Sequence, residues 1–550
     1  MPKILINEKD KTSPGTPGSY ANYSVLIAGY KGTPATGADA VIINPDSNGV
    51  YEFSSKQAFE DTIGIAEVEV KDDNGKVIEA HYGNRMAYEL LNLGYNIIYR
   101  PIDSVLDMNT EAFWEIFKDK ASYDFRFISH GLLATSYDAA EYAIKNARLS
   151  EIEADIKKLA DLTATVKAGV DFDKLDAEAQ AEVLNEAYSN VIRTVELGGE
   201  GYDGFRQTAA DGTKGLAYAS YADAAAMLMP NLEGDIPAYV AQKAMVDSYD
   251  ETCVTPTTFN NINGHITKLA RYLVDDKAAI PGRGDCIALI ELDENCYVAT
   301  TTTKPENLII DGINNMSSSI ADDGAYCALT VPSVNYKMSG EVKKFPGAFH
   351  YLACFMSSLR AGFAEWYAIA GYTRGVSSYV IDHTSVKLGE IAINALEPRN
   401  LVDDPAKIQP VFACNVIANF RGSYYLWGNR TAHKLGAAAG GNDLVAHHFL
   451  NIRQLCTTIK KQLYVACRRF TFDPNSDTLW FNFVNAITPT LDAMKADQGV
   501  RDYKILKVFT DKKATLKAKI RIIPIEAVED FDLEISLEDS FGETSAVVTE

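Results

Sequence analysis

Apolar runs of strand length and amphipathic segments of helix length alternate in the first 135 residues and again after residue 250. The strand-like runs cover residues 23–30, 96–100, 124–131, 285–292 and 325–336. The helix-like segments cover residues 54–63, 84–94 and 266–276. Apolar runs bounded by turn residues predict buried strands, and a period near 3.6 predicts helices. Strand–helix–strand alternation of this kind predicts an α/β fold.

Helix-forming residues dominate from about 138 to 250. This stretch is rich in Ala and acidic residues, and its charges are spread around the helix pattern. Because a helix with charges on all sides buries little apolar surface, we interpret the region as solvated decoration on the α/β unit.

A long amphipathic helix is predicted between residues 445 and 470. Its apolar stripe has steps of three or four and consists of Val445, Phe449, Ile452, Cys456, Ile459, Leu463, Cys467 and Phe470. Such steps place side chains on one face of a helix. Five basic side chains lie off the stripe: Arg453, Lys460, Lys461, Arg468 and Arg469. They form either a solvated face or a docking surface for an acidic partner.

A second helix is predicted directly after the first. Asn475 and Asp477 bound its candidate cap, and apolar residues follow at spacings of four, namely Leu479, Phe483, Ile487 and Leu491. Pro489 lies inside this pattern. Because proline lacks the backbone N–H and its ring clashes with the preceding turn, we expect a kink or an interruption there.

The hydrophobic period changes to two near the end of the chain. Residues 515–524 alternate apolar side chains with Lys517, Lys519 and Arg521, and the next such segment carries Phe531, Leu533, Ile535 and Leu537 between mostly acidic residues. Each segment predicts a strand with one apolar face, and the two outer faces carry opposite charge, which favours pairing.

A further β-prone run opens the chain, with Ile4, Leu5 and Ile6 ahead of two Pro-Gly pairs. Some five hundred residues separate this run from the C-terminal strands. Neither terminal run has an evident hairpin partner within the chain. We therefore predict that both pair with strands of other copies.

Composition indicates a soluble multidomain protein and argues against nucleic acid as a partner. The 550 residues are 47% hydrophobic and 23% charged, with a net charge of −22, whereas phosphate binding requires a basic footprint. Residues 396–525 nevertheless contain 19 Lys and Arg against 10 Asp and Glu, and the last 25 residues contain nine acidic residues and no basic one. A basic block therefore precedes an acidic tail.

The sequence predicts synthesis and folding in a cytoplasm, without export or membrane insertion. The first residues contain no apolar signal segment, and no apolar run approaches the length of a membrane span. Eight cysteines show no C-x-x-C spacing, and most lie in apolar runs. We therefore expect buried free thiols rather than disulfides.

Candidate chemistry is limited to three neighbouring pairs: Ser129–His130, Asp382–His383 and His447–His448. The first lies on a predicted strand, where neighbours point to opposite faces, so its side chains are not expected to pair. The second fits a structural role in a loop. The third lacks the i, i+4 spacing of a helical metal site, so we expect a helix surface. We predict no enzyme, with no catalytic residue, metal or cofactor.

Several motifs gather in the C-terminal half. The motif residues are Trp427, Gly428, Arg430 and Thr431 after a strand, Asn451 and Arg453 at the start of the long helix, and Pro474, Asn475 and Trp480 before and in the next helix. Residues 370–375 form a glycine-rich A-G-x-x-R-G turn. Together these motifs resemble the contractile-tail sheath protein family. Residues 17–34 also resemble the start of that family, and the resemblance is strongest from 345 to 540.

The resemblance implies a structural subunit that forms stacked hexameric rings around a tail tube and contracts to drive the tube through a host envelope. It implies a multidomain α/β (α+β) fold, with a central subtilisin-like domain without catalytic residues and a C-terminal α+β domain whose sheet neighbouring subunits complete. Its implied partners are other copies, the tail tube protein, and baseplate and tail terminator proteins. Its implied location is the virion tail, assembled in the host cytoplasm.

The same resemblance suggests a division of the chain and roles for residues. The expected parts are a linking arm (1–20), an α/β sheath domain (21–135), the helical insertion (136–250), the central domain (251–395), a tube-facing assembly domain (396–525) and an acidic linking arm (526–550). The five basic residues off the stripe become candidates for facing the tube. Trp427 is expected to pack under the following helix, and Arg430 to satisfy carbonyl groups or a carboxylate.

Two alternatives stay open. Within the same class, the chain is the sheath of a tailocin or of another contractile injection system. From another class, it is a cytoplasmic hydrolase built on an α/β layer, with a nucleophile in a pocket.

Overall fold

The structure, a computed structural model of the chain, describes residues 23–31, 40–64, 68–71, 77–133, 174–176, 179, 256–271, 282–297, 303–338, 340–397, 410–434, 445–509, 515–525 and 527. The predicted strands around Ile4–Ile6 and Phe531–Leu537 lie outside these residues, as does nearly all of the predicted helical region 138–250.

A mixed eight-stranded sheet forms the centre of the molecule. Its spatial order is β13 (Ser423–Trp427), β12 (Asn415–Phe420), β8 (Cys327–Val331), β7 (Ile287–Ile290), β6 (Phe127–Ser129), β1 (Ser24–Tyr30), β5 (Asn96–Ile102) and β2 (Tyr51–Phe53). The six inner strands are parallel, and β2 and β13 join the two edges in antiparallel orientation. The predicted α/β alternation is thereby confirmed.

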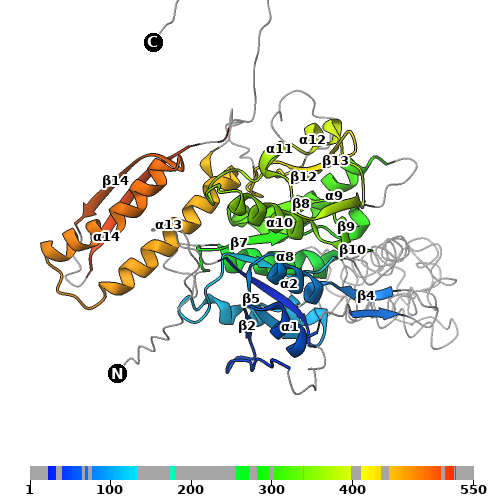
Figure 1. Cartoon of the computed structure of the whole chain (residues 1–550), viewed down its shortest axis with the longest axis horizontal. Helices are drawn as coiled ribbons and strands as arrows, with labels where there is room; N and C mark the ends of the chain where they lie inside the picture. Colours follow the sequence, from blue (N-terminus) through cyan, green and yellow to red (C-terminus); the bar gives the residue numbers. More distant parts are fainter. Residues whose placement is uncertain are drawn as a thin grey trace, which may run out of the picture.

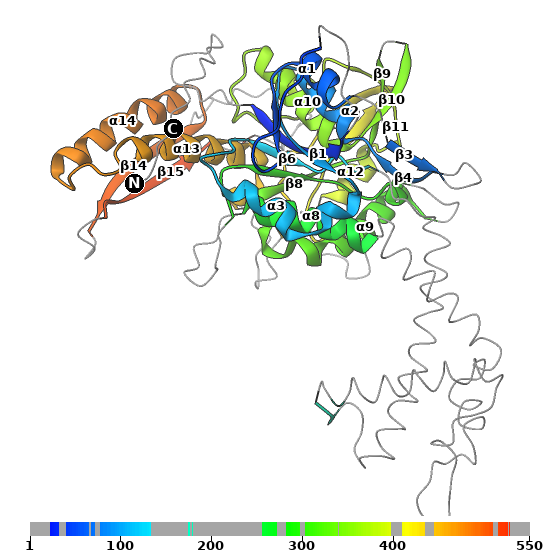
Figure 2. The same cartoon turned by 90° about the horizontal axis from the view of Figure 1, so that it is seen from below.

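Helices cover both faces of this sheet, as the view from below shows (Figure 2). One face packs against α1 (Lys56–Thr62), α2 (Gly83–Asn92) and α10 (Gly347–Arg360), and the other against α3 (Glu111–Glu115), α8 (Pro256–Ala270), α9 (Pro305–Ile320) and α12 (Glu390–Leu396). In β1, Val25 and Ile27 face the first layer, whereas Leu26 and Ala28 face the second. An all-apolar strand suits a sheet buried on both faces.

Smaller elements surround this α/β body, by which we mean the eight-stranded sheet with its covering helices. A three-stranded sheet contains β10 (Glu341–Phe345), β9 (Val334–Met338) and β11 (Val380–Thr384), and a hairpin contains β3 (Val68–Lys71) and β4 (Val77–His81). Short helical turns are η1 (Val105–Asn109), η2 (Ile116–Lys118), η5 (Glu294–Tyr297), η6 (Ala321–Tyr326), α11 (Gly371–Arg374) and η7 (Ala446–His448).

A C-terminal module extends to one side of the α/β body (Figure 1). The module consists of α13 (Leu450–Arg469), α14 (Asp477–Ala496), β14 (Val500–Val508) and β15 (Lys517–Pro524). Its small core combines residues from the helices, the hairpin and the body, namely Trp366, Leu455, Ile459, Leu491, Met494 and Val500. Both predicted helices and the alternating strand at 515–524 are confirmed.

Three sequence expectations for this module are corrected. Helix α14 continues through Pro489, so the interruption that was one of the two expectations there is wrong. Strand β15 pairs with β14 in the same chain, a partner that the sequence analysis did not find. The apolar stripe predicted for residues 445–470 is wrong at its two ends. Val445 lies before α13 and is exposed, and Cys467 near the end of the helix is exposed as well.

The eight-stranded sheet takes strands from three of the predicted domains. Strands β1, β2, β5 and β6 come from 21–135, β7 and β8 from 251–395, and β12 and β13 from 396–525. The predicted parts 21–135, 251–395 and 396–525 therefore share one sheet instead of each having its own. Distant parts of the chain complete a single hydrophobic core on each face of this sheet.

Candidate functional site

The first half of α13 is buried on nearly all sides, which marks it as the joint between the α/β body and the C-terminal module. Its buried residues are Leu450, Asn451, Ile452, Arg453, Gln454, Leu455, Thr457, Thr458, Ile459 and Lys461. Several of these are polar or charged, and buried polar groups require hydrogen-bond partners. Two polar clusters of the body supply most of them.

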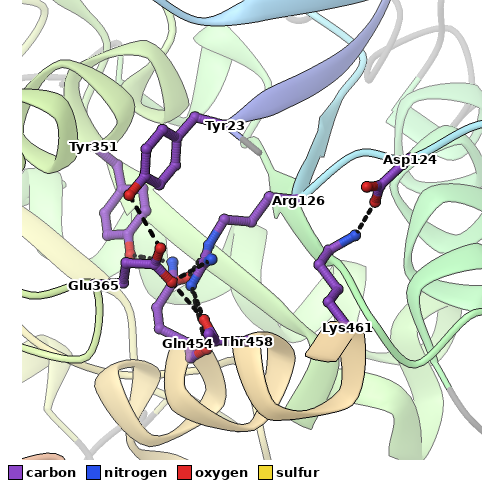
Figure 3. Close-up of polar contacts among 8 residues, drawn as sticks. All are labelled: Tyr23, Asp124, Arg126, Tyr351, Glu365, Gln454, Thr458 and Lys461. Carbon is purple, nitrogen blue, oxygen red and sulfur yellow. Dashed lines mark hydrogen bonds and ion pairs between the residues drawn. The ribbon is translucent and has the colours of Figure 1, made fainter. Parts of the chain in front are cut away.

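The first cluster centres on Arg126, which is fully buried at the start of β6 (Figure 3). Its Nη1 lies 2.6 Å from Glu365 Oε2, its Nε donates to Gln454 Oε1 at 2.9 Å, and its Nη2 donates to Thr458 Oγ1 at 2.8 Å. Gln454 Nε2 in turn donates to the hydroxyl of Tyr351 at 3.0 Å. Because three of its four hydrogen bonds go to Gln454 and Thr458 of α13, the guanidinium fixes the position of α13 on the sheet.

Glu365 also connects this cluster to the start of the first strand. The hydroxyl of Tyr23, the residue before β1, donates to Glu365 Oε1 at 3.0 Å, and Thr458 Oγ1 donates to Glu365 Oε2. Burial raises the pKa of Tyr23, and the negative charge of Glu365 raises it further. One carboxylate therefore binds the body, the root of the N-terminal segment and α13 together.

The second cluster surrounds Asp285 at the end of the loop before β7. The guanidinium of Arg283 pairs with Asp285 (Nε to Oδ1, 2.9 Å) and donates to the carbonyl oxygens of Phe117 and Tyr123 at 2.8 and 2.7 Å. Lys461 of α13 forms ion pairs with Asp124 and, at 3.6 Å, with Asp285. Burial alone would raise the pKa of Asp285, but the charges of Arg283 and Lys461 lower it below its usual value.

The Trp-Gly-Asn-Arg-Thr turn joins β13 to the start of α13. Asn429 accepts hydrogen bonds from the first turn of the helix, through its carbonyl from the Leu450 N–H and through Oδ1 from the Asn451 N–H, both at 3.0 Å. Its Nδ2 donates to Asn451 Oδ1 at 2.8 Å. Thr431 bonds back to the carbonyls of His447 and His448. The bonds to Asn429 satisfy helix N–H groups that would otherwise lack partners.

Arg430 has the structural role that the sequence predicts. Its side chain is buried, its Nε pairs with Glu397 Oε1 at 3.0 Å, and its Cζ lies 4.8 Å from the centre of the Phe449 ring. Trp427 is half-buried at the sheet edge, where its aromatic neighbours are Phe420 and Tyr372, with ring centroids 5.0 and 5.4 Å away. Arg430 therefore holds the joint, whereas Trp427 packs among aromatic side chains of β12 and α11 rather than under the following helix, so that expectation is wrong.

The remaining motif residues divide between the joint and the surface. Gly428 adopts a φ of +141°, and a Cβ there would lie 2.9 Å from Asn415 Cα, so the turn needs glycine. Pro474 and Asn475 are exposed in the turn between α13 and α14. Trp480 is half-buried on α14, with Lys507 Nζ 6.0 Å above its ring.

The five basic residues off the α13 stripe do not form one exposed face. Arg468 and Arg469 are exposed, whereas Arg453 and Lys461 are buried, and Lys460 is half-buried and donates to the Gly284 carbonyl at 2.8 Å. The sequence places them off the apolar stripe of the isolated helix, but the first half of α13 is covered from more than one side. Among these five residues, the exposed basic surface of α13 is therefore restricted to Arg468 and Arg469 at its outer end.

The three candidate pairs differ in whether their two side chains contact each other. The His130 ring bonds to Asn263 Oδ1 at 3.1 Å, whereas the Ser129 hydroxyl accepts from the Gly131 N–H, so the two side chains do not pair, as predicted. Asp382 and His383 do contact each other, at 2.9 Å. They lie on strand β11 rather than in the expected loop. His447 and His448 lie in the turn η7, and His448 is buried, so the expected helix surface is wrong.

A Cys–His pair that the sequence analysis missed lies inside α10. His350 Nε2 is 3.4 Å from the Sγ of Cys354, four residues along the same helix, and its Nδ1 contacts the Tyr336 hydroxyl. Burial lowers the pKa of His350 to about 3 and raises that of the Cys354 thiol. The neutral thiol is a poor nucleophile, so the pair serves packing. The i, i+4 spacing of His350 and Cys354 places both side chains on one face of a helix, and this spacing could have revealed the pair in the sequence.

The ranges that the structure describes contain neither a cluster of metal ligands nor a membrane-spanning helix. There, no group of three or more His, Cys, Asp or Glu is placed to hold a metal ion. Among the helices described, none combines the length and apolarity that crossing a membrane requires. All seven described cysteines are free, as predicted, and four of them are buried.

No family model matches the chain, and no curated protein matches it. Among solved structures, the chain is similar to the anti-feeding prophage (AFP) baseplate, with 10% identity, a TM-score of 0.47, and coverage of 98% of this chain and 99% of that one. It is similar to the AFP helical sheath in the contracted state, with 10% identity, a TM-score of 0.44 and the same coverage.

A third similar structure is the PVC sheath complex of an extracellular contractile injection system in the contracted state. Here the identity is 14% and the TM-score 0.35, over 47% of this chain and 66% of that one.

Proposed function

We propose that the chain is the structural subunit of a contractile sheath, of a phage tail or of a related contractile injection system. The observation that carries the proposal is the hairpin of β14 and β15. It is a sheet of only two strands in the described part of the chain, and it is held out on α13, away from the eight-stranded sheet (Figure 1).

The hairpin has the surface of a sheet that is built to receive further strands. On β15, Ala518, Ile520 and Ile522 are half-buried against the module, whereas Lys519 and Arg521 are exposed. Among the described residues, no third strand pairs with either edge. A two-stranded hairpin is marginally stable alone, and an open edge is a template for pairing.

The chain itself offers a strand that complements this edge. Residues 531–538 alternate four apolar side chains with mostly acidic ones, opposite in charge to the outer face of β15. We propose that the acidic arm (526–550) and the N-terminal arm (1–20) of neighbouring subunits add strands to this sheet, a form of β-augmentation. The C-terminal assembly domain is then completed only in the polymer.

The energetics of one such strand suit a lattice that forms on a template. Four inward apolar side chains contribute roughly 6–12 kcal/mol at about 1.5–3 kcal/mol each. Ordering eight residues costs on the order of 8–16 kcal/mol. A single donated strand is therefore marginal, and it becomes stable when several links act together through a high effective concentration.

The proposal includes the larger assembly that the family resemblance implies. Subunits would stack as hexameric rings around a tail tube, with baseplate and terminator proteins at the ends, and would contract on a signal. The six parallel inner strands with helices on both faces suit the proposed subtilisin-like domain. For the tube-facing surface, exposure favours Arg468 and Arg469 among the five basic candidates. The virion tail, or the corresponding injection device, is the proposed location.

Negative-stain microscopy of the purified chain tests the proposal. The wild-type chain should form tubes or rings, and deletion of residues 1–20 or 526–550 should abolish them while the subunit stays folded. In a matched pair, Leu533→Asn with Ile535→Asn should prevent polymerisation, whereas Asp532→Asn with Glu534→Gln should weaken it less, because the outer face contributes less than apolar burial. Polymers that survive both deletions would refute the proposal.

The tube-facing part has a separate test. Arg468→Glu with Arg469→Glu should impair sheath growth on a purified tube but leave tube-free polymerisation unchanged. Equal growth of the variant and the wild type on tubes would exclude these residues. Capsid and terminase genes beside the coding sequence would distinguish a phage tail from a tailocin or another injection system.

A further inference from the structure

Among the cationic side chains buried in the described residues, one lacks a carboxylate partner. The buried set consists of Arg126, Arg283, Arg430, Arg453 and Lys461. Arg126 pairs with Glu365, Arg283 with Asp285, Arg430 with Glu397, and Lys461 with Asp124 and Asp285. No carboxylate of the described residues lies within ion-pair distance of Arg453, although this residue is only 5% exposed.

The surroundings of Arg453 hold the guanidinium in place without neutralising it. Its Cζ lies 4.2 Å from the centre of the Tyr326 ring, and its Nη2 lies 2.9 Å from His447 Nδ1. Its Nε is buried and has no hydrogen-bond partner. A cation–π contact and one neutral acceptor compensate a buried cation less well than a carboxylate does.

The local electrostatics add further positive potential. Lys460 Nζ lies over the same Tyr326 ring, 5.2 Å from its centre. Arg453 is in the first turns of α13, where the helix dipole is positive, and that first turn contains no acidic residue. Burial lowers the pKa values of Lys460 and His447, and the charge of Arg453 lowers both further.

A buried and unpaired guanidinium is costly, and the cost is relieved when a carboxylate binds it through two hydrogen bonds. We propose that Arg453 and Lys460 form a binding site for a carboxylate, and that the acidic C-terminal segment of a second copy of this chain supplies it. The proposal rests on the proposed sheath function, because it requires that copies meet.

Two observations favour this occupant. The last 25 residues contain nine acidic residues and no basic one, and eight of the nine lie between 526 and 543, so many registers of that part present a carboxylate. The carboxylates of the body that contact α13, those of Asp124, Asp285 and Glu365, already pair with other cations. Because the guanidinium is recessed, a flat partner surface does not reach it, whereas a side chain on an extended segment does.

The experiment measures the critical concentration for tube-free polymerisation of the full-length chain, by light scattering and microscopy. Arg453→Met keeps the stem that packs on Tyr326 and removes the charge. We expect it to raise the critical concentration about 10- to 100-fold, the range for a charge-assisted hydrogen bond. The melting temperature of the free subunit should stay equal or rise, because an uncompensated charge is removed. Arg468→Met, exposed on the same helix, is the matched control and should change neither.

A double variant identifies the source of the carboxylate. In a background with all nine acidic residues of 526–550 changed to amides, Arg453→Met should produce no further rise, because the two changes remove the same contact. An additive effect, or a lower subunit melting temperature with an unchanged critical concentration, would overturn the proposal. If the wild-type chain does not polymerise at all, the proposed function fails, and titration of a synthetic 526–550 peptide then decides the site, since wild type but not Arg453→Met should bind it.

Discussion

The Arg126–Glu365 pair provides the sharpest test of how the joint holds α13 on the α/β body. We consider Glu365→Gln, which keeps the shape and one acceptor oxygen but removes the charge. Arg126 and Glu365 have side-chain exposures of 0% and 4%, so solvent cannot replace the lost partner. Removing one member of a buried pair destabilises by about 3–5 kcal/mol, because the other charge stays buried and unpaired.

The structure also predicts what kind of change restores stability. Arg126→Met combined with Glu365→Leu removes both charges together and should recover most of the loss, since apolar residues of similar volume replace a buried pair at little cost. Gln454 and Thr458 would then lose bonds to Arg126, so recovery should be incomplete. Lys495→Met is the exposed control: its pair with Asp502 has exposures of 48% and 63% and should contribute at most about 1 kcal/mol.

Urea unfolding followed by circular dichroism measures the loss, and hydrogen exchange of the α13 amides locates it. Glu365→Gln should lower the urea midpoint and speed exchange in the first half of α13 first, where both clusters make their contacts. The reasoning is refuted if Glu365→Gln costs less than about 1 kcal/mol, or if exchange rises equally in β14 and in α13.

Two further predictions concern other buried ionisable groups. His350 has a pKa of about 3 in the folded chain against about 6.5 in the unfolded chain. Because the unfolded state takes up the proton first, the free energy of unfolding falls as the pH drops below 6.5, by about 1.4 kcal/mol per pH unit. Urea midpoints at pH 6.5 and 4.5 should show this slope, and His350→Gln should reduce it. Lys461→Glu places a third carboxylate beside Asp124 and Asp285 and should prevent folding of the subunit, whereas Arg469→Glu, exposed on the same helix, should leave yield and circular dichroism unchanged.

Local periodicity was sufficient to predict most of the elements. Strand β1 consists almost entirely of apolar residues, and β15 alternates apolar and basic ones, so burial on two faces or on one face follows from the sequence. The predicted helix face of Leu479, Phe483, Ile487 and Leu491 is buried as expected. These properties depend on neighbours within a few residues, and the chain carries that information locally.

The sequence failed where an element departs from a simple period. Strand β14 contains a bulge between Val500 and Asp502, and the adjacent Ile505 and Leu506 break the alternation. The signal of a strand is therefore weak in this segment, and the partner of β15 was missed. Likewise, α14 continues through Pro489, although the local rule for proline favours a break there.

Only the tertiary structure decided which polar residues are buried and what they contact. Arg126 meets Gln454 across 328 residues of sequence, and Lys461 meets Asp124 across 337. The loop that contains Arg283 and Asp285 had no assigned role in the sequence, yet it receives the side of α13 that carries Lys461. A basic side chain off an apolar stripe is expected to face solvent when its helix is considered alone. On this helix, a second packing surface from the distant sheet reverses that expectation, because burial depends on every element that reaches the helix.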